Sequence, residues 1–282
     1  MDNGWHGMVI SMGDVTGMKR LITLLMLFAL PVLADPVMDM MALCQRPAPS
    51  GGGFWPSGMI GLWRLEGDYV DSVTTTNTGV PNYHNPLNNG DFSTDCKVGT
   101  NSAFYALVNV SYVNTPNLMS YTAQFSVSMW VKLRSTSDDV ANNFGLGLDT
   151  TGCAGIRVGG YVSYGTTNTY CIGLRDGGNY GADAQANSAY YAGGDTGWFH
   201  VVVTYDGTAT PKTHMYKNAV ELAVADYGMA TTIGSSLNIS LGGRHNEGGF
   251  RGNQDEVSVF SRVLTQSEVT ALYNEGNGQT YP

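Results

Sequence analysis

The segment FRGNQDEVSVFSRVLTQSEVTALYNEG, residues 250–276, contains two different periodicities in succession. Its first part alternates, as a β-strand does, and Asp255, Val257 and Val259 are expected on one face. The intervening residues Glu256, Ser258 and Phe260 are expected on the opposite face. Its second part has the period of a helix. The segment therefore predicts a strand that runs directly into a short helix.

The helical part carries its own start and stop signals. Thr265 with Glu268 three residues later is typical of a capping box at a helix N-terminus. One helical face then carries Val269, Leu272 and Tyr273. Gly276 lies where a helix would end, because glycine readily adopts the left-handed conformation of a C-terminal cap.

The composition favours many short strands over helices. Of the 282 residues, 43% are hydrophobic and only 13% are charged, and Gly (37) and Tyr (16) are plentiful. The formal net charge is −9, with only 14 Lys and Arg. Such a chain is a poor partner for phosphate, so nucleic acid and anionic membrane surfaces are not expected partners.

The N-terminal region is typical of a secretory signal. Residues 1–17 are interpreted as an upstream extension, and Met18–Ala34 combine a basic start, an apolar run and small residues at a cleavage site. The apolar run is shorter than the about 20 residues of a spanning helix, which favours cleavage and no membrane insertion, although an uncleaved anchor is the alternative. Residues 35–57 are rich in Pro and Gly and predict a linker, so one domain is expected over 58–282.

Four cysteines agree with an oxidising, extracellular or periplasmic destination: Cys44, Cys96, Cys153 and Cys171. Of the three possible pairings, we favour Cys44–Cys96 and Cys153–Cys171. The second pair would link two strands expected near 156–164 and 170–174. None of the four has the spacing of a zinc site.

Four further segments predict strands: 59–65, 125–133, 198–207 and a hairpin over 213–222. In the second and third, alternate residues form an apolar face, while Trp130 and Trp198 fall on the other face. These rings could stack on a sugar, but burial beneath loops is the favoured interpretation. The hairpin turn is Asn218–Ala219, where a non-glycine residue is costly, so a looser or longer turn is expected.

Several of these motifs resemble the laminin-G-like, concanavalin A-like lectin/glucanase family. The resemblance rests on Asp255–Glu256 before Arg262, Leu264, Thr265 and Glu268, and on FSVSMWVKL (125–133) and WFHVVVTYDG (198–207), and it covers residues 60–276. It implies an all-β jelly roll, a sandwich of two antiparallel sheets with one short C-terminal helix. It also implies a structural calcium ion held by Asp255 and one of Asp68 or Asp71, where solvated turn aspartates are the alternative.

No catalytic motif accompanies the fold. Glycan hydrolases need two carboxylates on one face, and the sequence contains no E-x-D-x-E or E-x-E strand and no G-x-S-x-G. Asp255 and Glu256 are adjacent, so a regular strand would send them to opposite faces. The five histidines show no metal-ligand spacing. The sequence therefore predicts a protein that is not an enzyme.

The residues we favour for ligand binding are Arg244, His245, Asn246 and Glu247, a polar group flanked by glycines beside the final strand. A solvated hairpin tip is the alternative. Asn179–Gly197 is expected to be a long surface loop. The resemblance implies a secreted recognition or adhesion module that binds carbohydrate or protein surfaces; a structural or assembly protein and a glycan-cleaving enzyme are the alternatives. Ligand identity and oligomeric state are left open.

Overall fold

The computed structural model describes residues 54–74, 77–83, 92–105, 111–115, 123–133, 144–147, 155–161, 169–175, 183–187, 197–226, 229, 239–244, 247–250 and 252–281. All of them belong to one compact unit, Pro36–Pro282. The predicted signal and most of the predicted linker lie outside the described residues. No helix within the described ranges is long and apolar enough to span a membrane.

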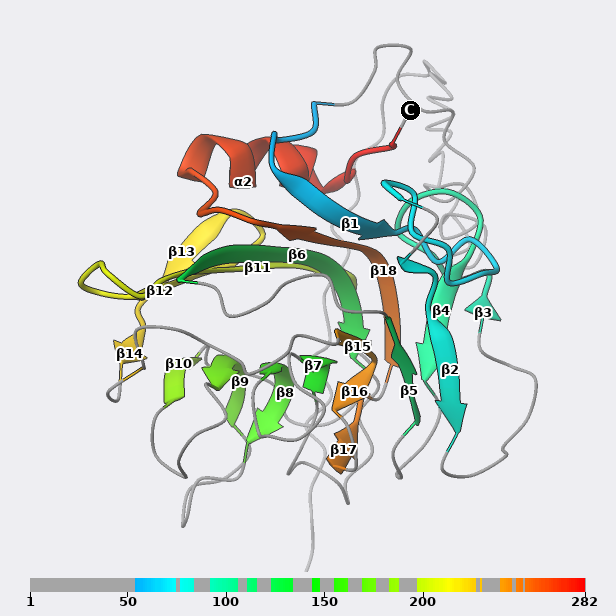
Figure 1. Cartoon of the computed structure of the whole chain (residues 1–282), viewed down its shortest axis with the longest axis horizontal. Coiled ribbons are helices and arrows are strands. Elements are labelled where there is room, and N and C mark those ends of the chain that lie inside the picture. The colour runs from blue at the N-terminus through cyan, green and yellow to red at the C-terminus, as the bar shows by residue number, and fades with distance from the viewer. Residues whose placement is uncertain are drawn as a thin grey trace, which may run out of the picture. The chain divides into compact units, whose positions relative to one another are not determined.

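Two antiparallel sheets form the domain (Figure 1). The first sheet has the order β13 (Val220–Leu222), β12 (Thr213–Lys217), β11 (Phe199–Asp206), β6 (Gln124–Leu133), β18 (Gly252–Phe260), β4 (Ser102–Tyr105) and β3 (Phe92–Ser93), and β1 (Met59–Trp63) also pairs with β18. The second sheet has the order β14 (Ala225–Asp226), β10 (Asp183–Asn187), β9 (Thr169–Arg175), β8 (Gly155–Tyr161), β7 (Phe144–Gly147), β15 (Ser240–Leu241), β5 (Ser111–Asn114) and β2 (Val80–Tyr83). A separate hairpin joins β16 (Gly243–Arg244) to β17 (Glu247–Gly249).

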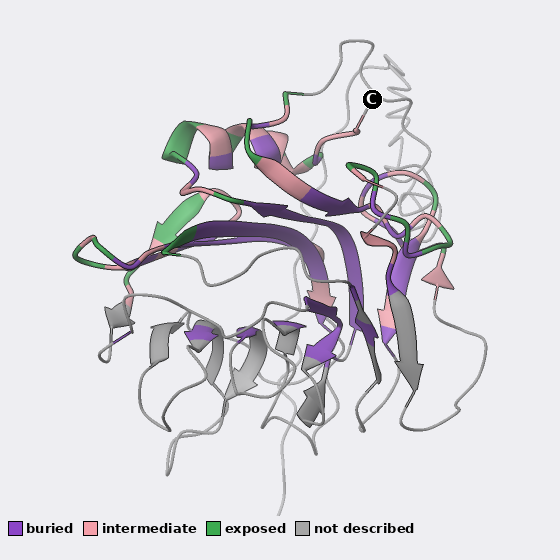
Figure 2. Cartoon of the chain, in the orientation of Figure 1, coloured by how far each residue is buried: buried purple, intermediate pink, exposed green. Residues whose placement is uncertain are grey.

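The main core lies between the two sheets. The alternating apolar residues of β6 point into it, as do those of β11, and the second sheet contributes Leu146, Ile156 and Leu174. All three of these second-sheet residues are buried. Figure 2 shows the buried strands of the first sheet facing the second sheet. The predicted all-β sandwich is therefore confirmed, and the apolar faces of β6 and β11 point inward as predicted.

A smaller core lies on the outer face of the first sheet, the face turned away from the second sheet. There α2 (Gln266–Tyr273) lies over the sheet (Figure 1). It packs Val269 and Leu272 against Val202 and Phe260. The predicted capping box is present at Thr265, and a 3-10 turn, η2 (Asn274–Gly276), follows. Since α2 is the only α-helix among the described residues, the prediction of one short C-terminal helix is confirmed.

The alternation predicted for the final strand is wrong at its centre. Asp255 lies opposite Trp130, whereas Ser258 lies opposite Ser128, so β18 has one residue more than β6 in this interval. Glu256 sits at this bulge with φ +47°. The extra residue at a bulge shifts the alternation, so residues on the two sides of it no longer keep the same order of faces. Asp255, before the bulge, therefore shares the outer face with Trp130, whereas Val257, after it, faces the core.

Two further expectations are corrected. The turn between β12 and β13 is tight, because Lys217 pairs directly with Val220, and both central residues adopt positive φ (Asn218 +51°, Ala219 +62°). Contacts from outside the hairpin hold it, including a hydrogen bond from the backbone N–H of His200 to Asn218 Oδ1 (2.9 Å). The segment expected to be a long loop contains β10, which pairs with both β9 and β14.

The two ends of the described domain lie side by side. The Trp55 ring meets the Tyr281 ring edge-on with centroids 5.7 Å apart. The Trp55 indole N–H donates to the backbone carbonyl of Thr280 (3.1 Å). Together with the pairing of β1 and β18, this contact packs the closing segment of the described domain against its opening one.

Candidate functional site

Two of the residues favoured for ligand binding, Arg244 and Glu247, belong to the β16–β17 hairpin. Arg244 and Glu247 are paired in its backbone, and His245 and Asn246 lie outside the described residues. The side chains of Arg244 and Glu247 are likewise outside the description. Their proposed role in binding stays a prediction.

Asp68 and Asp71, the predicted metal ligands of the opening loop, are engaged elsewhere. Asp71 is buried, and its carboxylate accepts hydrogen bonds from the backbone N–H groups of Leu62 and Val73 and from the Asn77 amide, each 2.9 Å long. Asp68 is exposed and accepts from the backbone N–H of Val70 (3.1 Å). Both act as turn aspartates that organise their own backbone.

Asp255, the third predicted ligand, lies instead beside two further acids, the buried Glu256 and the partly exposed Glu66. One Asp255 oxygen accepts from the backbone N–H groups of Lys97 (2.7 Å) and Val98 (2.9 Å). Burial raises the pKa of Asp255 well above its usual value, and the charge of Glu256 raises it further. Burial raises the pKa of Glu256 to about 8, although the nearby Arg64 guanidinium lowers it.

Glu66 holds the turn that leads into β4. One of its oxygens accepts from the backbone N–H groups of Thr100 (2.8 Å) and Asn101 (3.0 Å). Gly99 permits this approach, because a Cβ at that position would lie 1.4 Å from Glu66 Oε1, and its φ of +72° also favours glycine. Glu66 directly follows the first predicted strand, 59–65, and this position is the only sequence signal that could have indicated its role.

The carboxylate oxygens of these acids are chemically suited to bind a cation. Glu66 Oε1, Asp255 Oδ1 and Glu256 Oε2 are each buried and have no hydrogen-bond partner. Arg64 Nε donates to the other Glu256 oxygen (3.2 Å), and Arg64 Nη2 lies 3.7 Å from Glu66 Oε1, so Asp255 is the carboxylate of these three that Arg64 does not pair with. Within the described ranges, no three His, Cys, Asp or Glu side chains converge closely enough to hold a metal ion. An ion here would therefore also need backbone or water oxygens, which calcium commonly accepts.

Ser128 and His200 form the one pairing on this face that resembles part of a hydrolase site. Ser128 Oγ lies 2.8 Å from His200 Nε2, and both side chains are buried. His200 Nδ1 has no hydrogen-bond partner, so no carboxylate orients the ring as in a catalytic triad. Burial lowers the pKa of His200 to about 3. A histidine that holds protons so weakly makes a poor general base at neutral pH, and the pair is interpreted as structural.

Trp130 completes this covered region. Its ring stacks on Tyr273 of α2 with centroids 5.8 Å apart, and Lys97 Nζ lies 4.6 Å from its centroid. Only 3% of Trp130 is exposed. The interpretation of Trp130 as a covered ring is confirmed, whereas Trp198 is half-buried and donates its indole N–H to Asp95 Oδ1 (3.0 Å).

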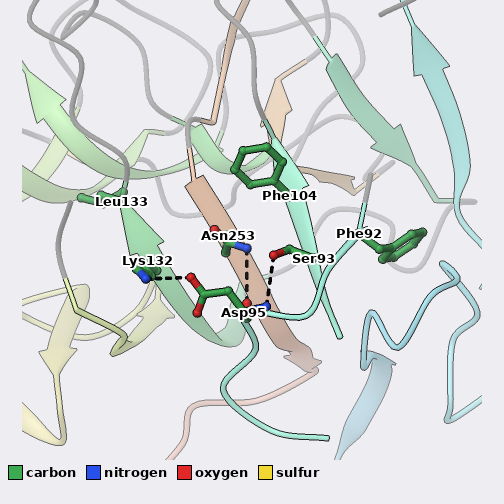
Figure 3. Close-up of a pocket in the computed structure, with 7 residues that line it drawn as sticks. All are labelled: Phe92, Ser93, Asp95, Phe104, Lys132, Leu133 and Asn253. Atoms are coloured by element: carbon green, nitrogen blue, oxygen red, sulfur yellow. Dashed lines mark hydrogen bonds and ion pairs between the residues drawn. The ribbon is translucent and has the colours of Figure 1, made fainter. Parts of the chain in front are cut away.

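Beyond this covered region the same face contains a pocket of about 350 Å³ (Figure 3). The residues that line it come from β3 and the turn after it, β4, the end of β6 and the start of β18: Phe92, Ser93, Asp95, Phe104, Lys132, Leu133 and Asn253. Its volume is at the lower end of the roughly 300–1,000 Å³ of small-molecule sites. The pocket is the candidate functional site, and no sequence motif indicated it.

The cysteines are only partly described. Cys96 is buried and disulfide-bonded. Cys44 and Cys153 lie outside the described residues, and only the backbone of Cys171 is described. The pairing of adjacent strands β8 and β9 agrees with the expected arrangement around Cys171, but both predicted disulfides stay predictions.

The fold and the family agree. Residues 108–270 match the model of the concanavalin A-like lectin/glucanases superfamily. Because this match spans more than half of the sequence, the chain belongs to that family. None of the curated proteins compared with this sequence matches it.

Solved structures show the same fold at low identity. One is domain 4 of AbnA, a GH43 extracellular arabinanase from Geobacillus stearothermophilus, in complex with arabinotriose (20% identity, 75% of this chain and 96% of that chain, TM-score 0.53). Another is the botulinum neurotoxin serotype G binding domain (16% identity, 76% of this chain and 50% of that chain, TM-score 0.52). A third is Trypanosoma rangeli sialidase (14% identity, TM-score 0.51), where the match spans 87% of this chain but 40% of the sialidase.

Proposed function

We propose that this chain is a secreted, non-catalytic recognition module that binds carbohydrate. The observation that carries the proposal is the open pocket on the outer face, where Asp95, Lys132 and Asn253 lie beside the half-buried ring of Phe104. Fixed polar groups beside an apolar ring are what a sugar needs, since it presents hydroxyl groups on its edges and C–H groups on its faces. The arabinanase domain was solved with arabinotriose, which supports a carbohydrate ligand by analogy of fold.

The accessible chemistry supports binding without turnover. Asp255 and Glu256 are adjacent acids, but they are 0% and 3% exposed, so a polymer cannot reach them without rearrangement. Retaining and inverting hydrolases both need two accessible carboxylates that flank the scissile bond. In the pocket, Asp95 is the only carboxylate among the described lining residues.

Secretion is supported by two independent features. The Met18–Ala34 segment has the layout of a secretory signal, and Cys96 is disulfide-bonded. An oxidising compartment outside the cytoplasm accounts for both. Processing after Ala34 can be measured by N-terminal sequencing of protein exported from a host cell, where an intact N-terminus would contradict it.

A glycan array tests the proposed function. We expect saturable binding to a restricted set of glycans and no release of reducing sugar from the same polysaccharides. Binding of no glycan, together with self-association of the protein, would favour a structural or assembly role. Turnover of any polysaccharide by pure protein would contradict the non-catalytic assignment.

Calcium remains part of the proposal, with Glu66 joining Asp255 in place of Asp68 and Asp71, and with backbone and water oxygens as the further ligands. Glu66 Oε1 and Asp255 Oδ1 are buried and make no hydrogen bond, which supports this choice. Calcium at about 100 times its dissociation constant should raise the Tm by roughly 5 °C or more relative to excess chelator. Glu66→Gln should reduce this shift, and Asp68→Asn, on the same loop, should retain it. An unchanged Tm of the unmodified protein in calcium and in chelator would contradict calcium binding.

A further inference from the structure

The pocket lies on one continuous row of side chains across three strands. Asn253 of β18 is directly opposite Phe104 of β4 on one side and Lys132 of β6 on the other. Directly opposite residues point to the same face of a sheet. Trp130, two residues before Lys132, also points to this outer face. The helix α2 covers the row around Trp130, while the row of Lys132 is left open.

The polar groups of the pocket are held in place by hydrogen bonds among themselves. Asp95 Oδ2 accepts from Lys132 Nζ (2.7 Å), and Asp95 Oδ1 accepts from the Trp198 indole (3.0 Å). The Asn253 amide nitrogen donates to the backbone carbonyl of Asp95 (3.3 Å) (Figure 3). It also donates to Ser102 Oγ (3.0 Å). The carboxylate, the ammonium group and the amide therefore have fixed orientations before any ligand enters.

Each of these groups retains hydrogen-bonding capacity. Lys132 has three N–H donors, of which Asp95 uses one. Each carboxylate oxygen of Asp95 has a second lone pair that can accept from a ligand. Both side-chain N–H groups of Asn253 are already used, so the side-chain carbonyl oxygen of Asn253 is the atom that can accept from a ligand. The side chains of Asp95 and Lys132 are 27% and 17% exposed, which leaves these positions accessible.

The charges select a neutral ligand. Lys132 is already neutralised by Asp95 at 2.7 Å, so an anionic group would meet a carboxylate as closely as an ammonium. The net charge of −9 adds to that repulsion. A hydroxyl group differs from an anion because it can accept from Lys132 and donate to Asp95 at once.

We propose that this pocket binds one unit of a neutral saccharide through a pair of adjacent hydroxyl groups, with a C–H face of the sugar against Phe104. One hydroxyl accepts from Lys132 and donates to Asp95, and its neighbour donates to the Asn253 carbonyl. This inference rests on the proposed function and names its ligand class and its site. Sugars that carry a carboxylate, such as uronic or sialic acids, are excluded by the same pair of charges.

Binding of defined sugars to the full chain tests the proposal. The probes are methyl glycosides of glucose, galactose, mannose and arabinose, their monodeoxy analogues, and methyl glucuronide, titrated calorimetrically alongside any neutral oligosaccharide that the array identifies. We expect at least one neutral sugar to bind, removal of one hydroxyl of the recognised pair to weaken it by about tenfold or more, and the glucuronide not to bind.

Variants locate the binding. Asp95→Asn and Lys132→Met should each weaken the recognised sugar by about tenfold or more, because each removes a charged hydrogen-bonding group while keeping the size of the side chain. Asp206→Asn, a matched change at the end of β11 and outside the pocket, should leave affinity unchanged. Thermal melting confirms that each variant is folded.

The outcomes separate the two proposals. If a glycan binds but Asp95→Asn and Lys132→Met bind it as tightly as the unmodified protein, the pocket assignment is wrong while the recognition function stands. Stronger binding of the glucuronide than of its neutral parent would overturn the ligand class. If no probe and no glycan on the array binds, both proposals are wrong.

Discussion

The outer face of the first sheet has two regions that share the same strands but differ in what lies on them. In the covered region, Trp130 and His200 are buried beneath Tyr273 of α2. In the open region, Lys132 and Asn253 line a pocket. Trp130 and Lys132 are two residues apart on β6, so the change from one region to the other occurs within one repeat of the strand. The face of a residue is decided by its strand, but its exposure is decided by a helix more than a hundred positions later in the chain.

The largest expected loss of stability comes from a substitution in the covered region. Trp130→Ala should lower the free energy of unfolding by about 3–5 kcal/mol, because it leaves a cavity under α2. Urea denaturation followed by circular dichroism measures the loss. Trp198→Ala, a half-buried tryptophan at the open end, is the matched control and should cost clearly less. Equal losses would mean that the two regions do not differ in packing.

The second effect uses the buried histidine of the covered region. The pKa of His200 is lowered to about 3, so below pH 6.5 the unfolded chain binds a proton that the folded chain does not. Stability from this group is therefore complete above pH 6.5 and decreases as the pH falls towards 3. Between pH 6.5 and pH 5 the loss should be about 2 kcal/mol.

His200→Gln measures that contribution by difference, since it keeps a polar atom near Ser128 without the titration. The variant should lose about 2 kcal/mol less than the unmodified protein when the pH is lowered from 6.5 to 5, as measured by urea denaturation at each pH. An unchanged slope in His200→Gln would show that His200 is not neutral in the folded protein.

The third effect concerns the hairpin that α2 contacts at the edge of the covered region. Ala219 adopts φ +62°, and its carbonyl accepts from Gln266 Nε2 of α2 (2.9 Å). Ala219→Gly should raise the free energy of unfolding by about 1 kcal/mol, because glycine removes the strain of the left-handed conformation. Thermal melting should show a higher Tm, while Ala271→Gly within α2 should lower it by a similar amount. A lower Tm for Ala219→Gly would mean that the turn is not strained.

The smallest stability effect is expected in the open region. Lys132→Met removes a partly exposed ion pair with Asp95 but keeps the aliphatic stem, so the free energy of unfolding should change by less than about 1 kcal/mol. Urea denaturation checks this value against Trp130→Ala on the same strand. A loss above about 2 kcal/mol would indicate that Lys132 supports the fold and not a binding site.

The sequence predicted what depends on local pattern. Alternation in β6 and β11 identified the buried faces, and the Thr265–Glu268 capping box located the start of α2. The bulge at Glu256 was missed because it depends on a mismatch in length between two strands that are distant in sequence. The tight turn at Ala219 was missed for a related reason, since contacts from β11 and α2 hold a conformation that alanine alone disfavours.

The candidate site was harder to predict than the fold. Asp95, Lys132 and Asn253 come from three separated segments, and none has a spacing that indicates a shared role. Each also looks ordinary in its own segment, as a loop acid, the polar position of an alternating strand and a strand asparagine. The strand register, which places Asn253 opposite Lys132, brings them together. They form an accessible pocket because α2 does not cover this part of the sheet.

The contact between Trp55 and Tyr281 bears on how this domain can be rearranged genetically. Because those two residues already touch, a short peptide could join them without displacing β1 or β18. New ends could then be opened at the exposed turn around Thr208, giving a circular permutant with the same sheets. By the same geometry, the domain could be spliced into a surface loop of a host protein without forcing the two host strands apart.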